Sequence, residues 1–350
     1  MFTDRSRFLI LLATLLCAAA VSAQQTIPRS QAGNTRIDLD VVVAPKSGPA
    51  VGDLQQQDFT ILDNKAPQTI TSFKAVPGRE APIEVILVVD AVNTGAQTVS
   101  YAREQIDKFL RLDSGHLAYP TALAVFTEQG VRVVGNFSGD GNALSAALQQ
   151  NNIGLRAVGR SAGYYGDAQR WQLSIGALNQ LVASVGPRPG RKIFLWVSPG
   201  WPLLSGPNTE LDSKQEQQIF ASIVNFSTQL RRARVTLCSV DPLGMNDMTR
   251  TTYYKEFLKG VNKPTQVNVG DLALPVLAIQ SGGLALNSTN DIARMLQQCV
   301  ADAAPYYEIS FDAPPAEKPN EYHQLEVKIA KPGLTARTRQ GYYAQPASHQ

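Results

Sequence analysis

The sequence IEVILVVDAVNT spans residues 83–94 and joins an almost continuously apolar run to a polar end. Such a run is typical of a β-strand buried on both faces, as the strands of parallel sheets are. Asp90 closes the run, so we expect it at the carboxyl edge of the sheet, where open α/β sheets bind their ligands. The stretch therefore predicts an α/β fold with a candidate site at Asp90.

Similar apolar runs alternate with helical patterns through residues 80–303. The other runs cover 121–127, 191–198 and 234–240. Between them, apolar residues at spacings of three and four predict amphipathic helices, of which the last is expected at 291–303. Strands that alternate with helices predict a mostly parallel sheet with helices on both faces.

The flanks of this region have a different pattern. Residues 34–77 and 305–343 contain segments in which apolar and polar residues alternate, which is typical of half-buried strands. Neither flank is long enough to form a stable sheet alone. We therefore expect the two flanks to pair into one small β-sandwich, followed by a polar tail at 344–350.

The first residues have the pattern of a secretory signal peptide. Arg5 and Arg7 precede an apolar run at 8–21, and small residues end at Ala23. The run is short for a membrane span, which takes about 20 residues. We expect cleavage near Ala23, a secreted or periplasmic mature chain, and no membrane insertion of that chain.

Composition narrows the classes of function. The 350 residues include 32 Lys and Arg against 29 Asp and Glu, and the basic residues are scattered, so no nucleic-acid partner is expected. Three Cys and three His argue against a Cys-rich scaffold or a His-rich metal cage. Cys17 leaves with the signal peptide. Cys238 and Cys299 remain, either as separate buried thiols or as a disulfide, and geometry decides between these.

Four stretches resemble one known family. Residues 88–94 (VVDAVNT) resemble the D-x-S-x-S metal motif of the von Willebrand factor A (VWA) family. Residues 54–73, the glycine pair 282–283 and residues 321–343 are similar to stretches of its bacterial secreted "VWFA-related" group. The resemblance covers about residues 35–343. It implies a VWA-like, Rossmann-like domain flanked by β segments, and a protein partner rather than a chemical reaction.

The metal site that the resemblance implies is degenerate. In the family the motif offers a carboxylate and two hydroxyls to Mg²⁺, and a Thr and a later Asp complete the set. Here Asp90 and Thr94 match, whereas Val92 and Pro199 replace two ligands and no clear Thr follows. Asp167 is an alternative carboxylate. The chain therefore has either a weak Mg²⁺ site or a metal-free remnant of one, and no cofactor is the favoured expectation.

These observations lead to a first hypothesis, a secreted, non-enzymatic protein-binding (adhesion or interaction) module that uses the loop edge of the sheet. Aromatic residues there either contact a partner or pack over the sheet end. The candidate partner-binding residues are Asp90, Asn93, Thr94, Tyr164, Tyr165, Asp167 and Trp201.

Two other functions remain as alternatives. Residues 159–163 match G-x-S-x-G, the nucleophile motif of serine hydrolases, with Ser161 as the nucleophile and Asp241 and His323 as its partners. The residues before Ser161 do not form the buried strand that this motif requires. The second alternative is a structural envelope protein that assembles with copies of itself.

Overall fold

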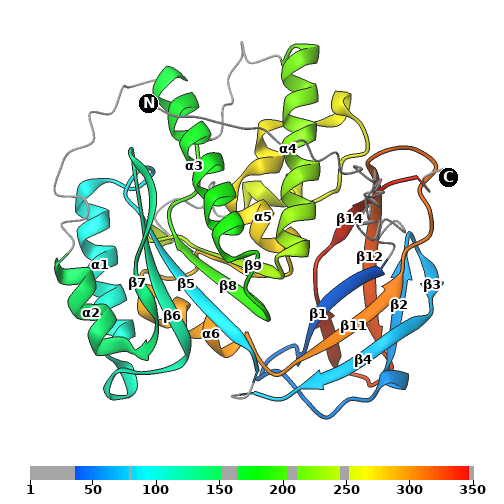
Figure 1. The fold of residues 1–350 in the computed structure, drawn as a ribbon, viewed down its shortest axis with the longest axis horizontal. Coiled ribbons are helices and arrows are strands. Elements are labelled where there is room, and N and C mark those ends of the chain that lie inside the picture. Colours follow the sequence, from blue (N-terminus) through cyan, green and yellow to red (C-terminus); the bar gives the residue numbers. More distant parts are fainter. Residues whose placement is uncertain (1–35, 79–80, 151–163, 203–210, 245–251, 347–350) are drawn as a thin grey trace, which may run out of the picture. The chain divides into compact units, whose positions relative to one another are not determined.

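The computed structural model describes residues 36–78, 81–150, 164–202, 211–244 and 252–346. They belong to one compact unit, Thr35–Gln350, which contains an α/β part and a β-sandwich (Figure 1). The expected signal peptide and the G-x-S-x-G motif lie outside the described residues.

A six-stranded sheet forms the centre of the α/β part. Its strands are β5 (Ile83–Asp90), β6 (His116–Thr127), β7 (Gly130–Asp140), β8 (Arg191–Val197), β9 (Val235–Val240) and β10 (Ala285–Leu286). The spatial order is β10-β9-β8-β5-β6-β7, and every neighbouring pair is parallel except β6 and β7. This is the doubly wound order, which reverses between β5 and β8. The predicted mostly parallel α/β sheet is confirmed.

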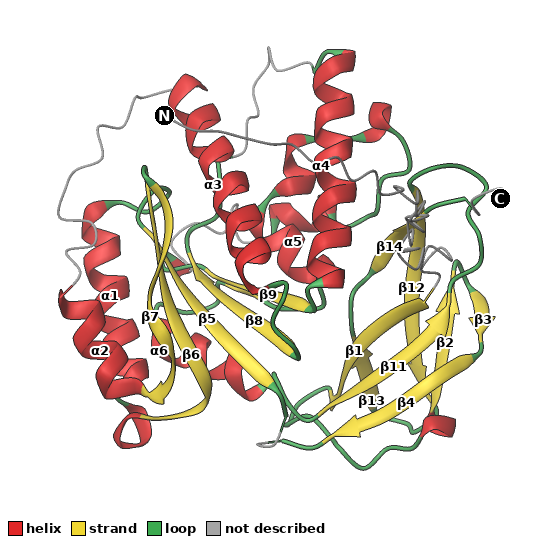
Figure 2. Ribbon diagram, viewed as in Figure 1, coloured by secondary structure: helices red, strands yellow, loops and turns green. Residues whose placement is uncertain are grey.

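Helices cover both faces of this sheet (Figure 2). One face carries α1 (Ala96–Leu110), α2 (Gly141–Gln150) and α6 (Ile292–Ala301), and the other carries α3 (Tyr164–Val185), α4 (Ser213–Arg232) and α5 (Leu274–Gln280). Successive side chains of β5 enter opposite cores, because strand side chains alternate. Leu87 packs in the first core and Val88 in the second, and both are fully buried. Two-sided burial accounts for the apolar run.

The β-sandwich consists of two four-stranded antiparallel sheets. The first has the order β13-β1-β11-β4 and the second β14-β12-β2-β3. The strands are β1 (Arg36–Pro45), β2 (Phe59–Asp63), β3 (Ala66–Gln68), β4 (Ile70–Val76), β11 (Tyr306–Asp312), β12 (Glu321–Ile329), β13 (Leu334–Arg337) and β14 (Gly341–Ala344). Each sheet combines strands from both flanks, as predicted. The last two strands, β13 and β14, follow each other in the chain but belong to different sheets.

Some local features escaped the sequence patterns. α2 and α5 were not predicted. α5 is short and apolar up to its last residue, Gln280, and such a run carries no helical periodicity. α4 begins at Ser213, directly after Asp212, which caps the helix in a capping box with Gln215. Short 3₁₀ helices are η1 (Gln56–Asp58), η2 (Leu112–Gly115), η4 (Tyr253–Phe257), η5 (Pro264–Gln266) and η6 (Val269–Leu272). None of the helices in the described ranges has the length and apolarity needed to cross a bilayer.

The sandwich and the α/β part share apolar cores and ion pairs. Val42, Val76 and Tyr306 of the sandwich pack in the core beneath α1 and α6. Arg337 of β13 pairs with Asp302, which follows α6. These contacts join the two parts through buried side chains.

Candidate functional site

Asp90 ends β5 at the point where the strand order reverses, and its side chain is 1% exposed. The amide nitrogens of Val92 and Asn93 donate to Oδ1, at 3.0 and 2.9 Å. Asn93 Nδ2 and Trp196 Nε1 donate to Oδ2, at 2.8 and 3.1 Å.

Four hydrogen bonds occupy the acceptor capacity of the Asp90 carboxylate. An ionised carboxylate offers about four lone-pair positions, so the chain's own groups already fill them. Val92, at the position of a metal-binding Ser in the family motif, is fully buried in the apolar core. Burial raises the pKa of Asp90, and the hydrogen bonds from Asn93 and Trp196 oppose that shift. This geometry suits a carboxylate that fixes the loop after β5.

The alternative carboxylate, Asp167, lies on α3 away from Asp90. Asp167 lies in the first turn of α3 and pairs with Arg170. Asn93 Nδ2 donates to Ser174 of the same helix at 2.9 Å. Asp167 stands seven residues before Ser174, about 10 Å further along the helix axis. Thr94 is buried near the edge, at 3% exposure.

No group of three or more His, Cys, Asp or Glu that is able to hold a metal ion occurs within the described ranges.

The aromatic candidates separate into buried and exposed residues. Trp201 is 3% exposed and packs edge-on against Trp196, with ring centroids 5.5 Å apart. For this residue the packing alternative is correct, so its ring is not available to a partner. Tyr165 is 85% exposed. The side chain of Tyr164 lies outside the described residues.

The first turns of α3 project beyond the sheet edge (Figure 1). Ser174 meets Asn93 at the level of that edge, and Tyr165 stands nine residues earlier on the helix. At a rise of 1.5 Å per residue this is about 14 Å. An exposed aromatic ring therefore stands above an edge that Asp90 holds in place.

His323 belongs to a different constellation from the one expected for a hydrolase. Its Nδ1 lies 2.8 Å from Asp63 Oδ1, and Tyr342 Oη donates to Asp63 Oδ2 at 2.5 Å. All three side chains are buried inside the sandwich. The carboxylate beside His323 is thus Asp63 rather than Asp241, and burial separates the imidazole from any substrate. Sequence reasoning missed this group, because β2, β12 and β14 meet only in the folded sandwich.

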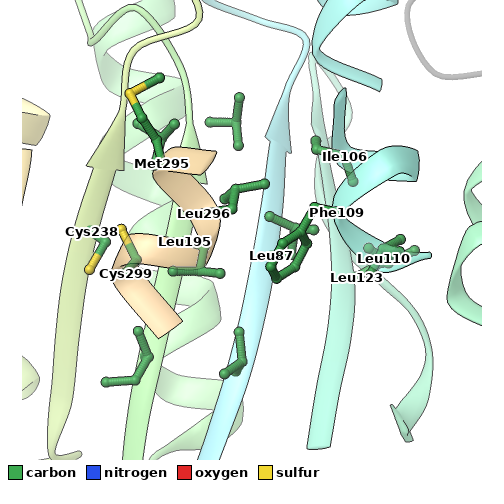
Figure 3. Close-up of a cluster of buried hydrophobic side chains, with 14 of the residues drawn as sticks. Leu87, Ile106, Phe109, Leu110, Leu123, Leu195, Cys238, Met295, Leu296 and Cys299 are labelled. Carbon is green, nitrogen blue, oxygen red and sulfur yellow. The ribbon is translucent and has the colours of Figure 1, made fainter. Parts of the chain in front are cut away.

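Cys238 of β9 and Cys299 of α6 face each other in the core (Figure 3). Both are free thiols and both are buried. The interaction between the two neighbouring side chains raises the pKa of Cys299 and lowers that of Cys238. Of the two expected arrangements, the structure shows the buried thiols and not the disulfide.

Trp196 was also missed as a partner of Asp90. It lies directly opposite Val88 in the parallel pairing of β5 with β8, two residues before Asp90. The available signal was the indole N–H itself, since a buried Trp usually finds an acceptor. The register between the strands was needed to identify which acceptor.

Comparisons with known proteins give only distant structural likenesses. No family model matches the chain, and no curated protein matches it. Among solved structures, proximal thread matrix protein 1 from the mussel byssus is 11% identical with a TM-score of 0.37, and the match covers 67% of this chain and 50% of that one. The chain thus spans about half the length of the mussel protein.

Two further solved structures cover nearly all of their own length. The SpRpn10 VWA domain is 10% identical with a TM-score of 0.32, and the match covers 65% of this chain and 98% of that domain. The manganese-loaded TRAP protein of Plasmodium vivax is 9% identical with a TM-score of 0.33, covering 78% of this chain and 98% of that one. Both likenesses are at low sequence identity.

Proposed function

We propose that this chain is a non-enzymatic protein-interaction module of the VWA type, which binds a protein partner through the carboxyl edge of its sheet without a metal ion. The observation that carries the proposal is the Asp90 carboxylate, which is buried at the switch point of the sheet and accepts four hydrogen bonds from its own chain. A carboxylate so occupied organises an edge and does not bind a cation.

The groups at this edge suit protein recognition. Tyr165 presents a large ring with few rotatable bonds, and such rings lose little entropy on binding and are enriched at the centres of interfaces. The ring stands on a helix that Asn93 and Ser174 join to the edge. A rigid platform reduces the ordering cost of association.

The burial of His323 favours a binding function over a catalytic one. His323, the imidazole required for a hydrolase, is held by Asp63 and Tyr342 in the interior of the sandwich. We therefore propose that the chain has no enzymatic role.

Export is part of the proposal and rests on residues 1–23 alone. The test is the mass of the chain recovered outside the cytoplasm, which we expect to begin at Gln24. A chain that retains residues 1–23 would contradict export.

A photo-cross-linking amino acid at position 165 tests the binding surface. The matched control places it at Val133, which is 40% exposed on the edge strand β7. We expect position 165, but not position 133, to give one discrete adduct with another protein, unchanged by EDTA. Equal adducts at both positions, or none at 165, would contradict the assignment. An adduct that is lost in EDTA would indicate that a metal ion takes part in binding at this edge. An adduct between two copies of this chain would favour the hypothesis of self-assembly.

A further inference from the structure

α3 and α4 cover the same face of the sheet (Figure 2), and an open groove runs between them. Its volume is about 470 Å³, within the range of about 300–1,000 Å³ that is typical of ligand sites. The lining is mainly apolar. From α3 it includes Asn179, Val182, Ala183 and the adjoining Gly186, which lie on one side of the helix because residues three and four apart are neighbours.

The facing side of α4 completes the groove with Asn225, Gln229, Arg232 and the adjoining Ala233. Because each helix leads into one of two parallel strands, α3 and α4 run in the same direction. Val182 and Ala233 are 3% and 5% exposed, and they form an apolar floor. The groove is about 10 Å long, since Asn225 and Arg232 stand seven residues apart on the helix.

One end of the groove is positively charged. Arg232 is exposed there and forms no ion pair within the described residues. The buried Lys192 lies beneath the same end, where its ammonium group donates to the carbonyl oxygen of Ala233 at 3.1 Å. None of the described residues that line the groove is acidic. The charge of this end therefore favours an anionic group on the occupant.

Toward the other end, the groove carries polar groups that match a peptide backbone. Gln229 Nε2 donates to Asn225 Oδ1 at 3.0 Å, which leaves the Gln229 carbonyl oxygen and the Asn225 amide N–H groups without a partner among the described residues. On the opposite wall, Asn179 Oδ1 is buried and also meets no hydrogen-bond donor in the described ranges. An acceptor beside a donor is complementary to the N–H and C=O groups of an extended peptide. The N–H groups of a helix are already bonded within it, so an extended segment fits better than a helix.

We propose that this groove binds an extended segment of a protein partner, which carries an apolar side chain and an acidic side chain within two residues of it. The apolar side chain packs on Val182 and Ala233. The peptide group meets Gln229 and Asn225, and the acidic group pairs with Arg232. Three extended residues span about 10 Å, which matches the length of the groove. This inference does not depend on the proposed function, because the groove uses none of the residues at the carboxyl edge of the sheet.

An array of immobilised random pentapeptides, probed with the purified protein, tests the groove. We expect the bound sequences to combine Leu, Ile, Val, Met or Phe with Asp or Glu no more than two positions away. Arg232→Glu should replace the acidic preference by one for Lys or Arg, because the reversed charge repels an acidic group. Lys214→Glu is the matched control, since it makes the same charge change at an exposed position of α4 about 27 Å from Arg232. It should leave the preference unchanged.

A second variant tests the floor of the groove. Ala183 is exposed on its wall, so Ala183→Phe should fill the groove and abolish peptide binding while the melting temperature stays unchanged. In solution, exchanging Glu for Gln in a selected pentapeptide should weaken its binding to the wild type about two- to fivefold, as expected for an exposed ion pair. The same exchange should not weaken binding to Arg232→Glu.

Three results of the array would overturn the proposal: no common pattern among the bound peptides, an unchanged acidic preference in Arg232→Glu, or binding retained by Ala183→Phe. Light scattering supplies a fourth test. A wild-type dimer that Ala183→Phe dissociates would also overturn the proposal, because the occupant would then be a second copy of this chain.

Discussion

Asp90 shows how one side chain can fix a loop while resembling a metal ligand. The sequence located it correctly at the end of a buried strand. Its hydrogen-bond partners were not predictable in full, because Trp196 reaches it from a strand 106 residues later. The pattern of apolar residues specifies where a strand ends, but not which donors its neighbour brings.

Replacing Asp90 tests its structural role. We expect Asp90→Ala to lower the free energy of unfolding by about 2–4 kcal/mol, because it leaves several buried donors without an acceptor. Urea unfolding measures the change, with the exposed Asp53→Ala as control. A melting temperature that rises with Mg²⁺ in the wild type, and not in Asp90→Ala, would instead identify a working metal site.

The two contacting thiols give a second test at this scale. Both are buried, so we expect the native protein to resist a thiol reagent such as Ellman's. After denaturation without reductant, we expect two titratable thiols from Cys238 and Cys299. If none is found, a disulfide joins them in the mature protein.

At the scale of secondary-structure elements, the periodicity of apolar residues identified the strands and the long helices. It did not identify the places where two backbone segments pack closely. The glycine pair 282–283 was noted only as a resemblance. In the structure, a Cβ on Gly283 would lie 1.7 Å from the carbonyl oxygen of Leu237. That constraint comes from the packing of the turn after α5 against β9, which has no local signature.

Gly283→Ala therefore tests the turn after α5. We expect the free energy of unfolding to fall by more than about 3 kcal/mol. The new Cβ clashes with a backbone carbonyl group, so the clash cannot be relieved by a side-chain rotation. Gly139→Ala is the matched control, since no atom lies within 4 Å of its Cβ position. Thermal unfolding of both variants measures the difference, and equal melting temperatures would refute the explanation.

The 3₁₀ helix η6 contains a carboxyl group whose titration affects stability. Burial raises the pKa of Asp271 to about 6, above its ordinary value of 3.8. The ionised carboxylate thus costs stability above about pH 6, and the cost vanishes as the pH falls toward 4. We expect Asp271→Asn to raise the free energy of unfolding relative to the wild type, because the variant lacks the buried charge. This increase should be about 3 kcal/mol larger at about pH 7.5 than at about pH 4.

Urea unfolding of Asp271→Asn and the wild type at the two pH values measures this gain. Asp53→Asn, at an exposed position, should show no such pH dependence. A gain for Asp271→Asn that is the same at both pH values would show that burial does not shift this carboxyl group.

At the scale of the whole molecule, the sequence predicted that the two flanks pair, but not how. The alternating strands offered no register, so their division into two sheets followed only from the structure. The sequence pattern also did not reveal the ion pairs of Arg234, which directly precedes β9. Its guanidinium pairs with Asp40 and with Glu308 of the sandwich, and the distance from Arg234 Nη2 to Glu308 Oε1 is 2.7 Å. Charged side chains of this kind carry no periodic signal.

The shared contacts predict cooperative unfolding. All three tryptophans (Trp171, Trp196 and Trp201) lie in the α/β part, so their fluorescence reports on that part alone. Far-ultraviolet circular dichroism reports on both parts. We expect the two signals to change at the same urea concentration. Transitions at separate concentrations would show that the sandwich unfolds independently.

The pairing of Arg36 in β1 with Asp312 in β11 also has a consequence for biosynthesis. A ribosome makes β1 and β2 long before β11 and β12 exist, so the nascent chain carries unpaired strand edges for most of its synthesis. Contacts so distant in sequence also form slowly. Exposed edges of this kind recruit other chains, so we expect the unfinished chain to be prone to aggregation until its last strands emerge.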